Sequence, residues 1–153
     1  MENNRFKKII KKIGLIGFII SLIFISYNVI RTIVKQPDQT RILETLKIEF
    51  NKINKLPNAL VVNENYLCIV DKTSIDISYS TSSIDNDILK FYDEQLLKNG
   101  WILVDKKKIY DWGRDLGGKE FTYSKLDFIF SIYFSGDRSG AGWNYSVFLK
   151  MRK

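Results

Sequence analysis

The distribution of apolar and polar residues divides the chain into one uninterrupted apolar stretch and a longer region of periodic apolar positions. Between Ile13 and Ile30 there is no charged residue, and most side chains are large and apolar. A helix of this length spans about 27 Å, close to the ~30 Å hydrocarbon core of a membrane. A buried helix of a globular protein would keep a polar face. We therefore predict a transmembrane helix at 13–34, after a basic cytoplasmic tail at 1–12.

The flanks of the apolar run distinguish an uncleaved anchor from a cleaved signal peptide. A signal peptide has a shorter apolar run followed by small residues at a cleavage site, and Ser26–Gln36 contains no such site. Five basic residues precede the run, and four more widely spaced ones follow it. The positive-inside rule then predicts a single-pass anchor in the cell membrane, with the N-terminus cytoplasmic and the C-terminal domain outside.

Residues 35–56 carry an amphipathic pattern typical of a juxtamembrane helix. Pro37 and Asp38 are suited to begin a helix, and Pro57 ends the pattern. Two heptads are too few to assign a coiled coil, so we expect this stripe to pack on the chain's own domain. The apolar positions recur every three or four residues, at Leu43, Leu46, Phe50 and Ile53.

The remaining segment, 57–153, has the patterns of a mixed α and β domain. The stretch TSIDISYST alternates polar and apolar residues, as a strand with one buried face does. A helix is predicted at 84–99, with Ser83 as its N-cap and acidic residues in its first turn. Its buried stripe is expected at Ile88, Leu89, Tyr92, Leu96 and Leu97.

Gly100 and Trp101 mark the joint between this helix and the next strand. Glycine adopts left-handed backbone conformations at little cost and commonly closes helices. An apolar residue that follows such a glycine packs back on the last turn of the helix. We therefore predict that Gly100 is left-handed and that Trp101 is a core residue.

Three further segments alternate in the manner of strands: GKEFTYS, DFIFSIYFS and WNYSVFLKM. Strands joined by short loops usually pair antiparallel. The predicted fold class is α+β, in which the transmembrane helix precedes a two-layer sandwich of a mainly antiparallel sheet packed by one or two helices. One face of the last strand is expected to carry Trp143, Tyr145, Val147, Leu149 and Met151.

The distribution of charge and the residue composition exclude several classes of function. The net charge is +7, but residues 1–35 hold seven basic groups and one acid, which leaves +1 for residues 36–153. A nucleic-acid-binding domain needs positive charge on its folded surface, so we predict no nucleic-acid partner. The chain has no histidine and only one cysteine, Cys68, which excludes the nucleophile–histidine arrangements and an internal disulfide. No catalytic residue, cofactor or metal is predicted, and we do not expect an enzyme.

Two loops hold the candidate partner-binding residues. Asp111–Gly118 contains Trp112 and Arg114, and Ser135–Gly142 contains Arg138 among glycines. Trp and Arg dominate the binding energy of many interfaces, and loops carry function more often than the scaffold does. Alternatively, Trp112 is tucked into the edge of the core. The glycines of the second loop suit a flexible connection between strands better than a phosphate cradle, which opens a helix.

The segments YSTSSIDNDILKFYDEQLLKNGW and GGKEFTYSKLDFIFSIYFSG carry a resemblance to a group of proteins. The chain resembles a recurrent domain of small bacterial lipoproteins and membrane-anchored proteins of unknown function. The shared features are a helix that ends in an aromatic-Tyr-x3-Leu-x3-Gly-Trp motif and a later hairpin. The resemblance implies the same fold and says little about activity. The chain departs from the lipoproteins by having an apolar helix in place of a lipidated cysteine.

These observations lead to one leading hypothesis and one alternative. We expect a monomeric, non-enzymatic binding domain of the bacterial cell envelope, outside the cytoplasm and anchored in the lipid bilayer by one helix. Its partner would be another envelope protein. The alternative is a membrane-tethered immunity or inhibitor protein that captures an incoming toxin or protease.

Overall fold

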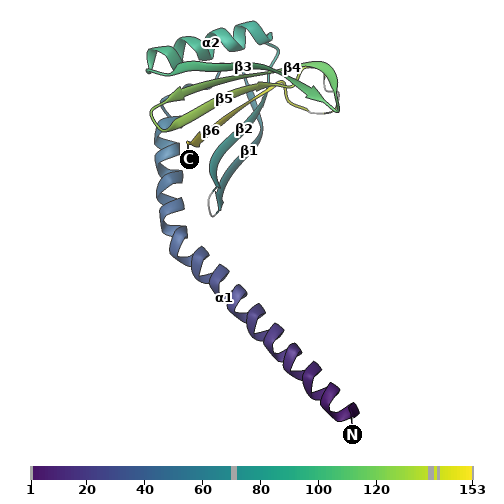
Figure 1. The fold of residues 1–153 in the computed structure, drawn as a ribbon. Helices are drawn as coiled ribbons and strands as arrows, with labels where there is room; N and C mark the ends of the chain where they lie inside the picture. The colour runs from purple at the N-terminus through teal and green to yellow at the C-terminus, as the bar shows by residue number, and fades with distance from the viewer. Residues whose placement is uncertain (1, 70–71, 138–139, 141, 153) are drawn as a thin grey trace. The chain divides into compact units, whose positions relative to one another are not determined.

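The computed structural model describes residues 2–69, 72–137, 140 and 142–152, with side chains for all of these except 2–15, 32 and 35–37. The chain separates into two compact units, Met1–Pro37 and Asp38–Lys153. Figure 1 shows the elements along the chain. In order they are α1 (Glu2–Phe50), β1 (Leu60–Ile69), β2 (Lys72–Ser80), α2 (Asp85–Lys98), β3 (Ile102–Asp111), β4 (Arg114–Lys125), β5 (Phe128–Phe134) and β6 (Tyr145–Met151).

The N-terminal helix α1 continues through Pro37, where the sequence pattern predicts that a new helix begins. A proline inside a helix costs ~3 kcal/mol, and the long helix-forming segments on both sides outweigh that cost. The helix ends at Phe50 rather than at the predicted Leu56. It ends there because the hydrogen bonds become shorter in range: the amide of Lys52 donates to the carbonyl of Glu49, three residues before it.

The predicted membrane span belongs to the first part of α1. Among the residues with described side chains, no helical segment has both the length and the apolar character needed to cross a membrane. The predicted span begins at Ile13, and the side chains of residues 13–15 lie outside the described part.

The six strands form one antiparallel sheet in the order β1-β2-β6-β5-β4-β3. Four of the five pairings join strands that are consecutive in the chain, as predicted. The fifth pairs β2 with β6, for example Ile77 with Val147, and so joins the N-terminal hairpin to the C-terminal strands. The predicted α+β fold with an antiparallel sheet is confirmed.

One face of the sheet, which we call the covered face, packs against α2 and the last turns of α1. At its centre, the ring of Phe130 lies 6.5 Å from that of Phe50 in α1 and 6.3 Å from that of Tyr92 in α2. Burying a Phe or Leu side chain contributes about 1.5–3 kcal/mol, so this face holds most of the apolar stabilisation. Its buried strand residues are Ile75, Ile77, Tyr79, Tyr123, Phe130, Ile132, Phe134, Tyr145, Val147 and Leu149.

The joint predicted at the end of α2 is confirmed. Gly100 is left-handed with φ +81, and its amide donates to the carbonyl of Leu97 at 3.0 Å. The amide of Trp101 donates to the carbonyl of Leu96 at 2.9 Å. Trp101 is buried, and its ring lies 5.8 Å from that of Phe130. The glycine thus returns the chain to the sheet and buries the tryptophan.

The start of α2 and one member of its stripe differ from the sequence prediction. The N-cap is Ile84, which makes no side-chain cap bond, so Ser83 is not the cap. The amide of Ser83 instead bonds to the hydroxyl of Thr81 at 3.2 Å, within the preceding loop. Leu97 is 53% exposed, because it lies beyond the edge of the stripe that faces the sheet. The buried residues of the helix are Ile88, Tyr92 and Leu96.

Neither α2 nor the last part of α1 packs on the opposite side of the sheet, which we call the open face. Its serines are at most 9% exposed, because larger residues such as Tyr133 and Phe148 stand beside them. The open face therefore consists of small polar residues close to the sheet, with larger aromatic side chains between them. It comprises Ser74, Asp76, Ser78, Glu120, Thr122, Ser131, Tyr133, Ser146, Phe148 and Lys150.

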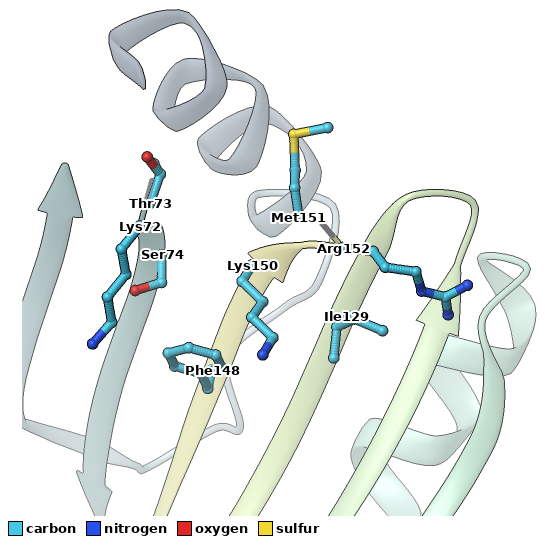
Figure 2. A pocket seen from close by; sticks show the side chains of 8 residues that line it. All are labelled: Lys72, Thr73, Ser74, Ile129, Phe148, Lys150, Met151 and Arg152. Atoms are coloured by element: carbon cyan, nitrogen blue, oxygen red, sulfur yellow. The ribbon is translucent and has the colours of Figure 1, made fainter. Parts of the chain in front are cut away.

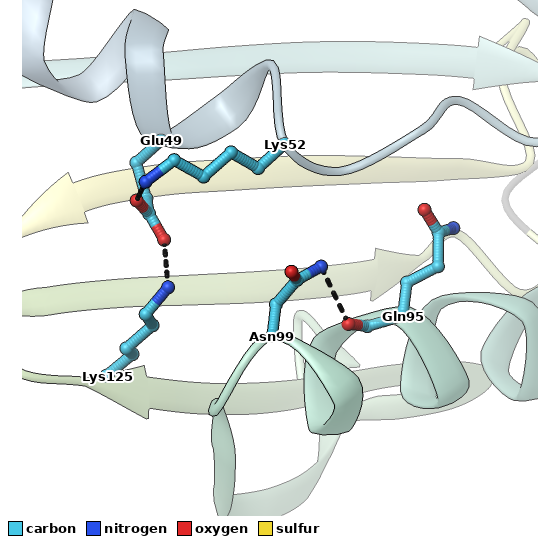
Figure 3. Close-up of polar contacts among 5 residues, drawn as sticks. All are labelled: Glu49, Lys52, Gln95, Asn99 and Lys125. Carbon is cyan, nitrogen blue, oxygen red and sulfur yellow. Dashed lines mark hydrogen bonds and ion pairs between the residues drawn. The ribbon is translucent and has the colours of Figure 1, made fainter.

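The end of α1 is also fastened to the domain by polar contacts (Figure 3). Buried Glu49 accepts hydrogen bonds from Lys125 Nζ at 2.5 Å and from Lys52 Nζ at 2.6 Å. Burial alone would raise the pKa of Glu49, but the two lysines outweigh burial and hold it below its ordinary value. Gln95 of α2 exchanges hydrogen bonds with the backbone of Asn54, at 2.8 and 3.3 Å.

Candidate functional site

Trp112 stands at the tip of the β3–β4 hairpin and is 94% exposed. With Gly113 it forms a two-residue turn, in which the two residues have φ +48 and +79. Positive φ at both positions is typical of a type I′ turn, for which Asn-Gly is the preferred sequence. A bulky left-handed residue costs of order 1 kcal/mol. Trp112 is therefore not tucked into the core, and the fold gains no stability from it.

The structure brings the two predicted loops together. A Cβ atom on Gly136 would lie 2.0 Å from the carbonyl oxygen of Leu116, so only glycine fits here. The amide of Asp137 donates to the same carbonyl at 2.7 Å. Leu116 of the first segment is thus in direct contact with Gly136 and Asp137 of the second, about twenty residues further along the chain. Most of the first is β-strand rather than loop.

The structure describes two of the three predicted partner-binding residues, Trp112 and Arg114. Arg114 is exposed at the first position of β4, one residue after the Trp112–Gly113 turn. Trp112 and Arg114 therefore share one end of the hairpin. Arg138 lies outside the described residues.

A cavity of about 340 Å³ lies on the open face, with Ile109 of β3 in its lining. Its lining comes from four strands and from the loop before β6. Pockets for small ligands usually have volumes of about 300–1,000 Å³, so this one suits a small molecule or a single chemical group. The side chains that line it include Asp76, Ile109, Tyr133, Trp143, Ser146 and Phe148.

Asp76 is the acidic residue of this cavity. Its side chain is half-buried, and within the described part of the chain no group donates a hydrogen bond to it or forms an ion pair with it. Burial raises the pKa of Asp76. An ionised carboxylate removed from water without a partner lowers stability, and such groups are concentrated at functional sites.

Glu120 is the contrasting carboxylate of the open face. It is 6% exposed and accepts hydrogen bonds from Lys107 Nζ at 2.6 Å, Thr122 Oγ1 at 3.2 Å and the hydroxyl of Tyr133. Burial alone would raise the pKa of Glu120, but the hydrogen bonds from Lys107, Tyr133 and Ser131 outweigh burial and lower it. Burial, together with the bond to Glu120, raises the pKa of Tyr133 to about 12. Tyr133 is therefore a neutral donor whose hydroxyl is fixed beside the cavity.

A second cavity, of about 460 Å³, lies at the other end of the open face and carries basic residues. Figure 2 shows the ammonium ends of Lys72 and Lys150 on either side of Phe148, which lines both cavities. Arg152 points away from them and donates to Ser124 Oγ at 2.6 Å. The open face thus presents basic side chains in one cavity and an acidic one in the other.

Of the residues that line this cavity, Trp143 was placed wrongly by the sequence pattern. It was expected on the covered face of the last strand, but β6 begins at Tyr145 and Trp143 lines the cavity on the open face. The strand begins late because Asn144 is engaged elsewhere. Its amide donates to the carbonyl of Tyr79 at 2.8 Å, and its side-chain oxygen accepts from the amide of Thr81 at 2.6 Å.

Comparisons of the chain with protein-family models, with curated proteins and with solved structures find no match.

Proposed function

We propose that the chain is a single-pass membrane protein whose domain, outside the cytoplasm, binds another component of the bacterial cell envelope without catalysis. The domain is the segment that follows Pro37. The Trp112 hairpin, with Arg114, is the part that contacts the partner.

The anchor is supported by the uncharged run Ile13–Ile30 and by the basic residues that precede it. The part of α1 with described side chains exposes large apolar groups, for example Phe18 at 62% and Phe24 at 68%. Exposed apolar groups are costly in water and stable in lipid. A basic N-terminal flank favours a cytoplasmic N-terminus.

The observation that carries the binding function is the exposure of Trp112. A fully exposed tryptophan in a left-handed turn position contributes no packing and imposes backbone strain. A large aromatic at the tip of a rigid hairpin suits an interface, where Trp is one of the residues that contribute most binding energy. Function, rather than stability, therefore explains its presence.

Partner capture from native membranes tests this role of Trp112. We expect Trp112→Ala in the full chain to reduce the amount of crosslinked partner about tenfold, as the loss of a hot-spot residue does. Leu126→Ala is the matched control, because Leu126 is 80% exposed, has φ +50 and lies in the turn at the opposite end of β4. Equal capture by wild type and Trp112→Ala would refute the assignment.

The orientation is tested separately by protease added to intact spheroplasts. The proposal predicts removal of the domain without lysis. A domain that is cleaved only after lysis would place it in the cytoplasm and overturn the location.

A further inference from the structure

The cavity around Asp76 has the composition of a cation site, and the hairpin function proposed above does not use it. One carboxylate lies among the aromatic side chains of Tyr133, Trp143 and Phe148. The fourth aromatic residue of the lining, Phe134, belongs to the buried core on the covered face. The aromatic residues come from β5, from the loop before β6 and from β6 itself. Three segments therefore converge on one acidic group that no described residue neutralises.

Among the described residues, no neighbouring lysine forms an ion pair with Asp76, and Lys72 lines the other cavity. Lys107 is paired with Glu120 at 2.6 Å. Lys150 lies with its ammonium 5.8 Å from the ring centroid of Phe148, in the other cavity. The charge of Asp76 is thus left for a ligand.

We propose that this cavity binds an organic ammonium group, with Asp76 supplying the negative charge and the three aromatic residues supplying the walls. Aromatic faces attract cations, and cages of this kind recognise quaternary ammonium ions. When such a cation binds, it forms an ion pair with the single carboxylate of the site.

The lining distinguishes this ligand class from other cations. Calcium and magnesium require six or more oxygen ligands, and the cavity offers one carboxylate and the hydroxyls of Ser146 and Tyr133. A primary ammonium donates three hydrogen bonds and so needs three acceptors, whereas the hydroxyl of Tyr133 already forms hydrogen bonds with both Glu120 and Ser131. A methylated ammonium needs charge and apolar contact but no hydrogen bonds. It therefore fits this lining best.

The test uses the full chain in maltoside micelles and choline as the probe, with binding followed through the backbone amide signals of Ser146 and Phe148. The matched control ligand is 3,3-dimethylbutan-1-ol, which has the shape of choline without its charge. We expect choline to bind about tenfold or more tightly than the neutral alcohol. Equal affinities would show an apolar cavity without cation recognition and would overturn the proposal, as would an absence of choline binding.

Variants of the chain test the assignment of the residues. Asp76→Asn keeps the shape of the side chain and should weaken choline binding about tenfold or more, while Trp143→Leu should weaken it severalfold. Lys150→Gln is the control, because it changes a nearby charge of opposite sign and should leave the affinity unchanged or slightly higher. Unaltered affinity in Asp76→Asn, with a native amide spectrum, would refute the site.

Discussion

On the covered face of the sheet, Phe130 is fully buried among aromatic rings, whereas on the open face Asp76 is half-buried with no partner among the described residues. The two residues belong to one sheet, on the strands β5 and β2 that flank β6. The difference is that two helical segments bury the covered face, whereas the open face consists largely of small polar residues. Apolar burial stabilises the first face, while an isolated carboxylate destabilises the second. We infer that the covered face maintains the fold and that the open face is available for binding.

Truncation in the covered core should have the largest effect. Phe130→Ala removes a fully buried ring and should lower the free energy of unfolding by about 3–5 kcal/mol. Phe148→Ala on the adjacent strand is the control on the open face, and its half-buried ring should cost about 1–2 kcal/mol. Urea unfolding of the full chain in maltoside measures both. Equal losses would remove the distinction between the faces.

Loss of the ion pair between buried Glu120 and exposed Lys107 should have an intermediate effect. Glu120→Gln should lower the free energy of unfolding by about 1–2 kcal/mol at neutral pH, since the substitution removes the negative charge that accepts from Lys107. Because the folded-state pKa of Glu120 lies below its ordinary value of 4.5, the pair stabilises the fold above that pH. The difference between wild type and variant should therefore shrink as the pH falls below 4.5. A difference that grows in acid would contradict this assignment.

Asp76→Asn should change stability in the opposite direction. Removing the unpaired charge should raise the free energy of unfolding by up to about 1 kcal/mol at neutral pH, since solvent screens part of the cost. The folded-state pKa of Asp76 is raised, so wild type loses stability as the pH rises through that pKa and the variant does not. The gain should disappear near pH 3.8, the ordinary value for the group. Thermal unfolding measured at both pH values tests the sign.

The smallest effect is expected at the hairpin tip. Trp112→Asn should stabilise the chain by about 0.5 kcal/mol, because asparagine is preferred at the first position of a type I′ turn. Leu126→Asn at the opposite turn is the matched change, and it too should cause no loss. A clear destabilisation by Trp112→Asn would mean that the tryptophan belongs to the fold.

Local patterns predicted the covered face well. The left-handed Gly100 and the buried Trp101 follow from the end of a helical stripe, and the core positions of β5 follow from strict alternation. Both depend on residues that are near each other in the sequence. The same reasoning correctly joined consecutive strands into antiparallel pairs.

The open-face site could not be predicted in this way. Asp76 and Phe148 become neighbours through the β2–β6 pairing, which links segments about seventy residues apart. Alternation assigns residues to faces but does not say which strands are adjacent. Trp143 was misplaced because the alternation continues into a loop that the contacts of Asn144 keep out of the strand. The exposure of Trp112 likewise depends on a turn that the sequence left open.

The central claim, that the open face gives up stability to hold a cation, is tested most directly by urea unfolding of wild type and Asp76→Asn with and without choline. A ligand that binds only the native state raises its stability by RT ln(1 + [L]/Kd). We expect Asp76→Asn to have the higher urea midpoint without choline, and choline to raise the midpoint of wild type clearly more than that of the variant. A variant that is less stable without choline, or that responds to choline as wild type does, would contradict it.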